Sequence, residues 1–222
     1  MSYGNIDGRI GQFYDHCLQE GFSQARFFTR DNLGGFIAAS VDAYRDYPLF
    51  LHVFGGRYDE NTLAHMMKID LGVRLKTMAG IACEGFESVM MAEPPLAKKT
   101  GMLQYFGSAS PKDYLLLFNP AICRQEIYEK YAARKREEYL DDKTWYIYIF
   151  ATRKKYQCQG YGKQLMNLLL SFADKTGGRI CLETDLADNV PMYERFGFKT
   201  VDISLYKGVL EHFVMLYAGK ER

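Results

Sequence analysis

The sequence predicts an α/β domain, because segments with the pattern of strands and of helices alternate along its second half. Residues 145–151 are almost entirely apolar, as expected for a strand that is covered on both faces. Apolar residues then recur at helical spacing from Leu165 to Ala173, and Gly177 ends that segment. Residues 180–184 have the pattern of a second strand. Such an alternation packs helices against a sheet.

The composition describes a chain that can bury a sizeable core. Of its 222 residues, 48% are hydrophobic and 15% are aromatic, which excludes a disordered chain. The net charge of +1 lacks the basic excess of a nucleic-acid-binding protein. No apolar run approaches the ~20 residues that cross a bilayer. We therefore expect neither a nucleic acid nor a membrane as partner.

Cysteine and histidine are scattered along the chain. The five cysteines are odd in number and form no C-x-x-C pair, so a disulfide framework and a zinc site are both unexpected. The four histidines lack ligand-like spacing, and we expect no metal. Free thiols fit a reducing cytoplasm. Residues 1–7 lack the basic and apolar parts of a signal peptide, which also favours a cytoplasmic location.

The remaining segments carry weaker signals. We treat residues 1–28 as an N-terminal extension of uncertain structure and residues 29–222 as a single domain. In the first half, the patterns predict a helix over 33–44 capped at Asp31 and Asn32, a helix from Asp59 to about Met78, and a hairpin of 80–83 and 88–92. Further along, they predict a helix over 120–142, a short helix over 190–196, and a final strand pair of 198–205 and 211–218.

The helix predicted over residues 120–142 is rich in charged side chains. Its acidic and basic residues balance, and many stand four positions apart. We interpret them as a solvent-exposed helix face rather than as a binding patch.

The turn between the apolar strand and the leucine-rich helix reads YQCQGYGK, residues 156–163. A helix start offers unpaired amides and a positive dipole end, and glycine lets the backbone approach a ligand. Four basic residues lie in or beside this turn, with no acidic residue from Arg153 to Lys163. The turn therefore predicts a site for a polyphosphate.

Two common phosphate loops do not fit. A nucleoside-triphosphate loop needs a glycine where Gln157 stands and a Ser or Thr where Gln164 stands. A dinucleotide loop needs a third glycine where Leu165 stands. The spacing that is present is Gln157-x-x-Gly160-x-Gly162.

This spacing resembles the Q/R-x-x-G-x-G/A loop of the Gcn5-related N-acetyltransferase (GNAT) superfamily. A second signature follows at the typical distance, with Asn189, then Tyr193 four residues later, then Gly197 and Phe198. The resemblance is specific over residues 145–201 and extends more loosely back to about residue 31, while residues 1–28 fall outside it.

The resemblance implies a mixed, mostly antiparallel sheet with helices on both faces. A central pair of parallel strands would splay apart to hold acetyl-coenzyme A, the implied cosubstrate. Its diphosphate would lie on the backbone of the loop, its pantetheine would pair with the end of the first central strand, and Asn189 would contact it. The implied binding residues are Phe150, Ala151, Thr152, Gln157, Cys158, Gln159, Gly160, Tyr161, Gly162, Lys163 and Asn189.

Two side chains are candidates for the chemistry. In the family, the tyrosine of the second signature often lies near the thioester sulfur, so Tyr193 is the candidate general acid; a phenol with a pKa of ~10 stays protonated at neutral pH. Glu183, near the carboxyl end of a central strand, is a candidate base. Tyr148 and a chain of water molecules are alternative bases, and Glu183 is also compatible with a structural role.

The resemblance implies an N-acetyltransferase that moves an acetyl group to a primary amine by direct attack in a ternary complex. A small-molecule amine is the expected partner, and the sequence leaves open whether the protein forms a homodimer. The acceptor pocket is expected around the helices over 33–47 and 63–78 and the loop over 101–110. The alternative is a protein of the same fold that binds coenzyme A as a sensor or interaction module without catalysis.

Overall fold

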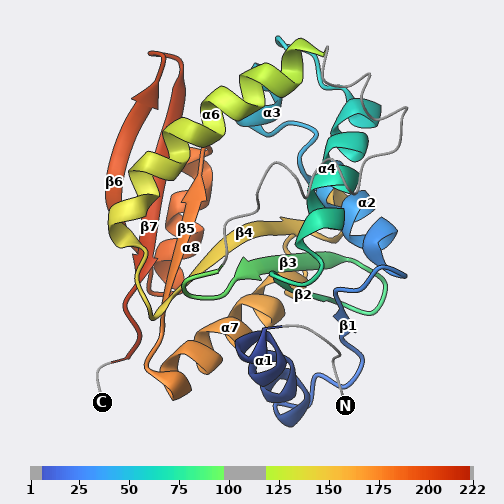
Figure 1. The fold of residues 1–222 in the computed structure, drawn as a ribbon, viewed down its shortest axis with the longest axis vertical. Helices are drawn as coiled ribbons and strands as arrows, with labels where there is room; N and C mark the ends of the chain where they lie inside the picture. Colours follow the sequence, from blue (N-terminus) through green and yellow to red (C-terminus); the bar gives the residue numbers. More distant parts are fainter. Residues whose placement is uncertain (1–6, 98–118, 221–222) are drawn as a thin grey trace.

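The computed structural model describes residues 7–97 and 119–220. The described residues form a seven-stranded mixed sheet in the order β1-β2-β3-β4-β5-β7-β6 (Figure 1). Its neighbours are antiparallel except for the central pair, β4 and β5, which run parallel. The expected fold class, including the central parallel pair, is confirmed. The strands are β1 (Arg26–Phe27), β2 (Ala79–Ala82), β3 (Ser88–Glu93), β4 (Thr144–Thr152), β5 (Arg179–Thr184), β6 (Lys199–Tyr206) and β7 (Leu210–Tyr217).

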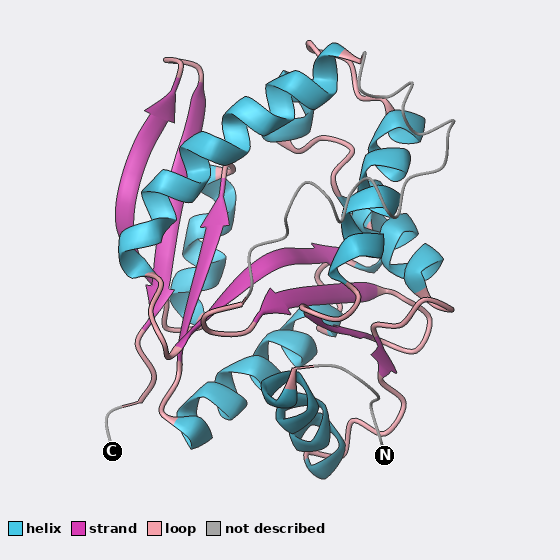
Figure 2. Ribbon diagram, in the orientation of Figure 1, coloured by secondary structure: helices cyan, strands magenta, loops and turns pink. Residues whose placement is uncertain are grey.

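Helices cover both faces of the sheet (Figure 2). The core on one face joins Trp145 and Ile147 of β4 to the leucines of α7 and to α1. The core on the other face joins Ile149 and Ala151 of β4 to α2 and α4. The helices are α1 (Gly8–Gln19), α2 (Leu33–Ala43), α3 (Pro48–Val53), α4 (Glu60–Arg74), α6 (Pro120–Arg136), α7 (Tyr161–Thr176) and α8 (Val190–Arg195), with 3-10 turns η2 (Glu137–Tyr139), η3 (Lys154–Tyr156) and η4 (Ala187–Asn189).

Most sequence-predicted elements form where expected. The hairpin is β2 and β3, the final strand pair is β6 and β7, and Gly177 ends α7 with a φ of +69°. The Asp59 carboxylate caps α4 by accepting from the Thr62 amide at 3.0 Å. That helix ends at Arg74, short of Met78.

Asn32 occupies the N-cap of α2, as predicted, but its side chain makes no cap bond to that helix. Its side-chain oxygen instead accepts from the Thr29 amide at 2.9 Å, and its amide nitrogen donates to the Phe27 carbonyl. The side chain therefore ties down the turn after β1. A further helix, α3, follows α2, and Pro48 occupies its first turn.

The solvent-exposed interpretation of the 120–142 segment is wrong for part of it. The helix α6 ends at Arg136, and η2 follows. The Arg136 side chain keeps only 15% of its surface exposed, because its guanidinium lies 4.5 Å over the Tyr146 ring and pairs with Glu183 at 2.9 Å. Charge balance along a helix does not reveal which side chain faces a sheet.

The helix α1 is built into the core of the domain. Ile10, Phe13 and Cys17 are at most 1% exposed and share one cluster with the buried leucines of α7. His16 Nε2 lies 2.8 Å from Ser171 Oγ of α7. The domain boundary at residue 29 stays a sequence prediction, but residues 8–27 contribute a helix and a strand to the same sheet and core.

Phe13→Ala is expected to lower the free energy of unfolding by about 3–5 kcal/mol, because it removes a ring packed against Trp145 and Phe172 and leaves a cavity. Chemical denaturation of both forms measures the change. The matched control is Gln19→Ala at an exposed position of α1, which should change stability by less than about 0.5 kcal/mol. A loss no larger for Phe13→Ala than for the control would mean that α1 adds nothing to the core.

Candidate active site

The sheet opens between its two parallel strands. β4 and β5 pair only from Thr144 with Arg179 to Ile147 with Leu182. Beyond these pairs β4 stays with β3 as far as Thr152, whereas β5 stays with β7 as far as Thr184. Figure 1 shows the two strands diverging from a common end. The facing edges of β4 and β5 therefore leave backbone groups for another partner.

A β-bulge in β4 lies at the point of divergence. Ile149 pairs with Met91 and Ile147 with Ala92, so Tyr148 is the extra residue. The bulge shifts the alternation of side chains. Tyr146 and Tyr148 share the face of α6 and α4, whereas Phe150 turns toward Tyr193 on the other face.

The loop after β4 leads to an uncapped helix start. Gly160 occupies the N-cap of α7 with a φ of +90°, and no side chain caps the helix. The amides of Tyr161, Gly162 and Lys163 have no partner within the helix, which is the general basis of anion binding at helix starts. Cys158 is exposed and also has a positive φ, +59°. The loop thus leaves backbone amides at the helix start open to a ligand.

The loop lies close against the end of β4. A Cβ on Gly162 would stand 3.0 Å from Thr152 Oγ1 and 3.1 Å from the Phe150 ring, so only glycine fits without displacing them. The Gln157 side chain donates to the Thr152 carbonyl at 3.2 Å and so ties the loop to the end of β4. Gln159 donates to the Lys155 carbonyl at 2.8 Å.

Of the other predicted cofactor residues, two are bonded within the fold and two lie beside the loop. The Ala151 side chain is buried in the core with α2, and its carbonyl accepts from Ser88 Oγ at 3.1 Å. The Asn189 side chain donates to Thr184 Oγ1 at 3.2 Å, so it ties η4 to β5 and does not cap α8. Tyr161 and Lys163 lie in the first turn of α7, beside the loop.

Tyr193 of α8 faces the opening. It is 5% exposed, and its ring centroid lies 6.3 Å from that of Phe150 and 6.0 Å from that of Phe198. Burial raises the pKa of this phenol, so it keeps its proton at neutral pH. Among the residues that the structure describes, none hydrogen-bonds to its hydroxyl. The geometry suits a proton donor.

Sequence reasoning missed two further tyrosines beside Tyr193. The Tyr47 hydroxyl accepts from the Asp185 amide at 2.7 Å and lies 3.3 Å from Thr184 Oγ1. Burial raises the pKa of Tyr44, while the Phe150 amide donates to its oxygen and opposes that rise. Both phenols also interact electrostatically with that of Tyr193. No spacing marked them, since they lie beside the break before α3.

Glu183 lies on the other side of β5, away from Tyr193. Its Oε2 accepts from Arg136 at 2.9 Å and from the Tyr146 hydroxyl at 2.6 Å. A carboxylate held by two donors is poorly placed to take a proton. Tyr148, the alternative base, donates to Asp70 at 2.8 Å, and burial raises its pKa well above the usual value. The geometry therefore gives both side chains an orienting role and leaves the base open.

A buried charge cluster supports the end of β5. His212 is fully buried; its Nδ1 lies 2.9 Å from Asp185, and its Nε2 lies 3.3 Å from Glu183. The Tyr128 hydroxyl donates to Asp185 and lies 2.9 Å from His212 Nδ1. Burial lowers the pKa of His212, but hydrogen bonds and charges of Asp185 and Glu183 outweigh it and raise the pKa to about 9.

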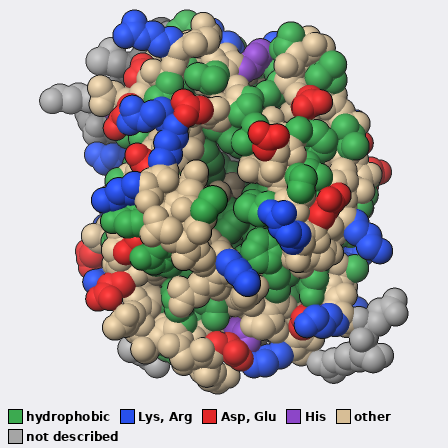
Figure 3. Space-filling model, turned by 180° about the vertical axis from the view of Figure 1, so that it is seen from behind, with side chains coloured by type: hydrophobic (Ala, Val, Ile, Leu, Met, Phe, Trp, Pro, Cys, Tyr) green, Lys and Arg blue, Asp and Glu red, His purple; other side chains and the backbone are tan. Residues whose placement is uncertain are grey.

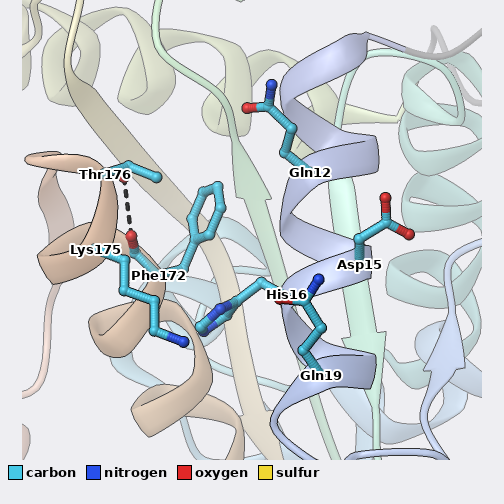
Figure 4. A pocket seen from close by; sticks show the side chains of 7 residues that line it. All are labelled: Gln12, Asp15, His16, Gln19, Phe172, Lys175 and Thr176. Atoms are coloured by element: carbon cyan, nitrogen blue, oxygen red, sulfur yellow. Dashed lines mark hydrogen bonds between the residues drawn. The ribbon is translucent and has the colours of Figure 1, made fainter.

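The surface has several hollows. Figure 3 shows a face hollowed along its middle, with hydrophobic side chains inside and basic ones on both sides. A pocket of about 270 Å³ adjoins the end of β5 and is lined by residues 185–188, Pro48 and residues 209–211. Another of about 320 Å³ lies between α1 and α7, where His16, Phe172 and Lys175 meet (Figure 4). None of the predicted site residues lines the pocket between α1 and α7.

Metal sites and membrane-spanning helices can be assessed for the described part of the chain. Within residues 7–97 and 119–220, no group of three or more His, Cys, Asp or Glu side chains is arranged to hold a metal ion. In the same ranges no helix has the length and apolar character to cross a bilayer. The acceptor loop expected over residues 101–110 lies outside these ranges.

The fold and the site define a class of protein. It is an α/β domain in which the two central parallel strands separate, and a helix whose first turn contains glycines begins after the first of these strands. Residues 122–198 match the acetyltransferase (GNAT) family. The chain is 36% identical over 58 residues to an uncharacterized N-acetyltransferase of Schizosaccharomyces pombe, over 26% of this chain and 24% of that protein. The segment 122–198, which contains the loop of residues 156–163 and Tyr193, thus has the sequence character of the GNAT family. The chain spans about a quarter of the length of that curated relative.

Solved structures share the fold at low sequence identity. An N-acetyltransferase of Staphylococcus aureus superposes with a TM-score of 0.57 at 12% identity, over 87% of this chain and 99% of that one. A structure from Corynebacterium glutamicum, described as histone acetyltransferase HPA2 and related acetyltransferase, has a TM-score of 0.55 at 17% identity, over 89% and 97%. These likenesses support the architecture.

The charge cluster at His212 should make stability depend on pH. Because the folded pKa of about 9 exceeds the unfolded value of about 6.5, the contribution is complete below pH ~6.5 and is lost as the pH rises through ~9. The loss is at most about 3 kcal/mol. Denaturation at several pH values should show a steeper decline for the wild type than for His212→Gln. Titration of the imidazole near pH 6.5 in NMR spectra of the wild type would contradict this prediction.

Proposed function

We propose that this protein is an N-acetyltransferase that moves an acetyl group from acetyl-coenzyme A to a primary amine by direct attack in a ternary complex. The observation that carries the proposal is the meeting of the uncapped α7 start with the opening between β4 and β5. The match of residues 122–198 to the family supports acetyl transfer, and the free thiols support work in the cytoplasm.

The proposed cosubstrate site uses backbone at both ends. The diphosphate would lie on the amides of residues 158–163, where Gly162 leaves room for close approach. The pantetheine amides would pair with the free edge of β4 at residues 150–152, as an added strand. Asn189, tied to Thr184, would line the opposite wall. The acetyl group would then lie near the bulge at Tyr148.

The proposed reaction forms one C–N bond and breaks one C–S bond. A neutral amine attacks the carbonyl carbon, and the developing oxyanion needs a donor. The Phe150 amide, whose hydrogen bond lowers the pKa of Tyr44, is the proposed donor. As the C–S bond breaks, Tyr193 gives its proton to the leaving thiolate. The proton that the nitrogen loses as the amide forms restores the phenol.

Gly160→Trp is expected to abolish acetyl-coenzyme A binding, because an indole at the N-cap would fill the space over the helix start and the φ of +90° disfavours any side chain. Isothermal titration calorimetry measures the affinity. Gly21→Trp is the matched control, with a φ of +81°, open surroundings and a place outside the loop. Equal affinities for all three forms would refute the assigned phosphate site.

Tyr193→Phe is expected to lower kcat by about 100-fold while leaving acetyl-coenzyme A affinity unchanged, because the ring stays and only the proton donor is lost. Thiol release with an accepted amine reports kcat, and calorimetry reports affinity. Tyr217→Phe, which removes a hydroxyl bonded to Asp174, serves as control. An unaltered kcat would exclude Tyr193 as the general acid. Tight cosubstrate binding without transfer to any amine would favour the non-catalytic alternative.

A further inference from the structure

The chain from the end of α2 to the start of α3 is bonded to both of the strand ends that separate. The Asp42 carboxylate accepts from the Lys154 amide at 2.8 Å, and the Asp46 carboxylate pairs with the Lys154 ammonium. Lys154 begins η3, just after β4. The Tyr47 hydroxyl accepts from the amide of Asp185, the first residue after β5, at 2.7 Å. This segment therefore connects the two strand ends, which do not pair with each other.

Both partners of the bond between Tyr47 and Asp185 are fixed by other contacts. The Tyr47 amide donates to the Tyr44 carbonyl at 3.0 Å. The Tyr47 ring centroid lies 5.5 Å from that of Tyr44 and 6.2 Å from that of Phe50. The buried carboxylate of Asp185 lies 2.9 Å from His212 Nδ1. The Tyr47 hydroxyl therefore joins two well-supported parts of the fold.

A chain of hydrogen bonds leads from Tyr47 to the helix that carries Tyr193. The Tyr47 hydroxyl lies 3.3 Å from Thr184 Oγ1, which accepts from the Asn189 side chain at 3.2 Å. Asn189 directly precedes α8, and Tyr193 lies about one turn further along. The phenols of Tyr47 and Tyr193 also interact electrostatically. Tyr47 is thus connected, through Thr184, to the residue at which the helix of the proposed general acid begins.

The short helix α8 depends on contacts of this kind. It has six residues, and no side chain caps its start. A helix of this length is not stable by itself, so other segments fix where it lies. Ring contacts with Phe150 and Phe198 hold Tyr193, but apolar packing is non-directional and does not aim a hydroxyl. The bond from Asn189 to Thr184 is a directional contact that ties the start of α8 to β5.

We propose that Tyr47 is a positioning residue for acetyl transfer, which holds Tyr193 in place through Thr184 and Asn189. This inference rests on the proposed function, in which Tyr193 protonates the leaving thiolate. A proton donor must lie within hydrogen-bond reach of the atom that it protonates, so a small displacement of α8 slows the proton transfer. Tyr47 itself exchanges no proton in the reaction.

The first test compares Tyr47→Phe with Tyr139→Phe. Each substitution removes one hydroxyl that bonds a backbone group, but the Tyr139 hydroxyl donates to the Val201 carbonyl of β6, at the edge of the sheet, at 3.1 Å. Tyr47→Phe should lower kcat about 10-fold and leave acetyl-coenzyme A affinity unchanged, because the phosphate-type loop is untouched. Tyr139→Phe should keep the wild-type kcat. Thiol release with spermidine, phenethylamine and a peptide as acceptors reports kcat, and calorimetry reports affinity.

A double-variant cycle separates positioning from a general loss of structure. If Tyr47 acts through Tyr193, adding Tyr47→Phe to Tyr193→Phe should change kcat by less than about 2-fold, because the proton donor is already gone. Thr184→Val, which breaks the chain of bonds at its middle, should lower kcat as Tyr47→Phe does. Multiplicative losses in the double variant, or a wild-type kcat in Tyr47→Phe or Thr184→Val, would overturn the inference while acetyl transfer stands.

A second measurement needs no acceptor. In protein labelled with fluorotyrosine, the fluorine resonance that is missing from Tyr193→Phe belongs to Tyr193. Tyr47→Phe should shift or broaden this resonance, and Tyr139→Phe should leave it unchanged. An unchanged resonance in Tyr47→Phe would overturn the coupling to Tyr193, whether or not transfer is observed. A wild type that acetylates no amine would overturn the proposed function together with the role of Tyr47, even if the resonance shifts.

Discussion

The site depends on one constraint, the early end of pairing between β4 and β5. Each strand keeps its outer neighbour, so the sheet stays continuous while its centre opens. The bulge at Tyr148 makes the two faces of β4 unequal at this point, with apolar Phe150 on one side and the tyrosine–arginine pairs on the other. The α7 start lies at the end of the same strand, so a long ligand could be held by backbone along its whole length.

The two sides of the opening differ in the polarity of their side chains. Toward α7 and α8 the walls are apolar, and the polar contacts come from helix and strand backbone. Toward α4 and α6 they are charged, with each arginine held by carboxylates. Buried ion pairs contribute little net stability, since desolvation offsets their attraction. Their value here lies in fixing where side chains stand around an opening that has no backbone pairing of its own.

Sequence reasoning identified the elements whose signals are local. The loop is recognisable because the positive φ of Gly160 and the close approach of Gly162 to Thr152 and Phe150 both favour glycine. Tyr193 was marked by its distance from Asn189 and Gly197. By contrast, the sequence pattern places Arg136 on a solvated helix face, because its neighbours along α6 are charged and only its contact with Tyr146 of β4 sets it apart.

The sequence by itself determined most strands and helices after residue 33, the phosphate-type turn and the family resemblance, since each follows from spacing along a few consecutive residues. Tertiary structure alone decided which face of β5 carries Glu183, that Tyr44 and Tyr47 meet Tyr193, and that α1 belongs to the core. The last two outcomes depend on packing between segments more than 100 residues apart. The first depends on strand register, where a one-residue shift reverses the face of every side chain.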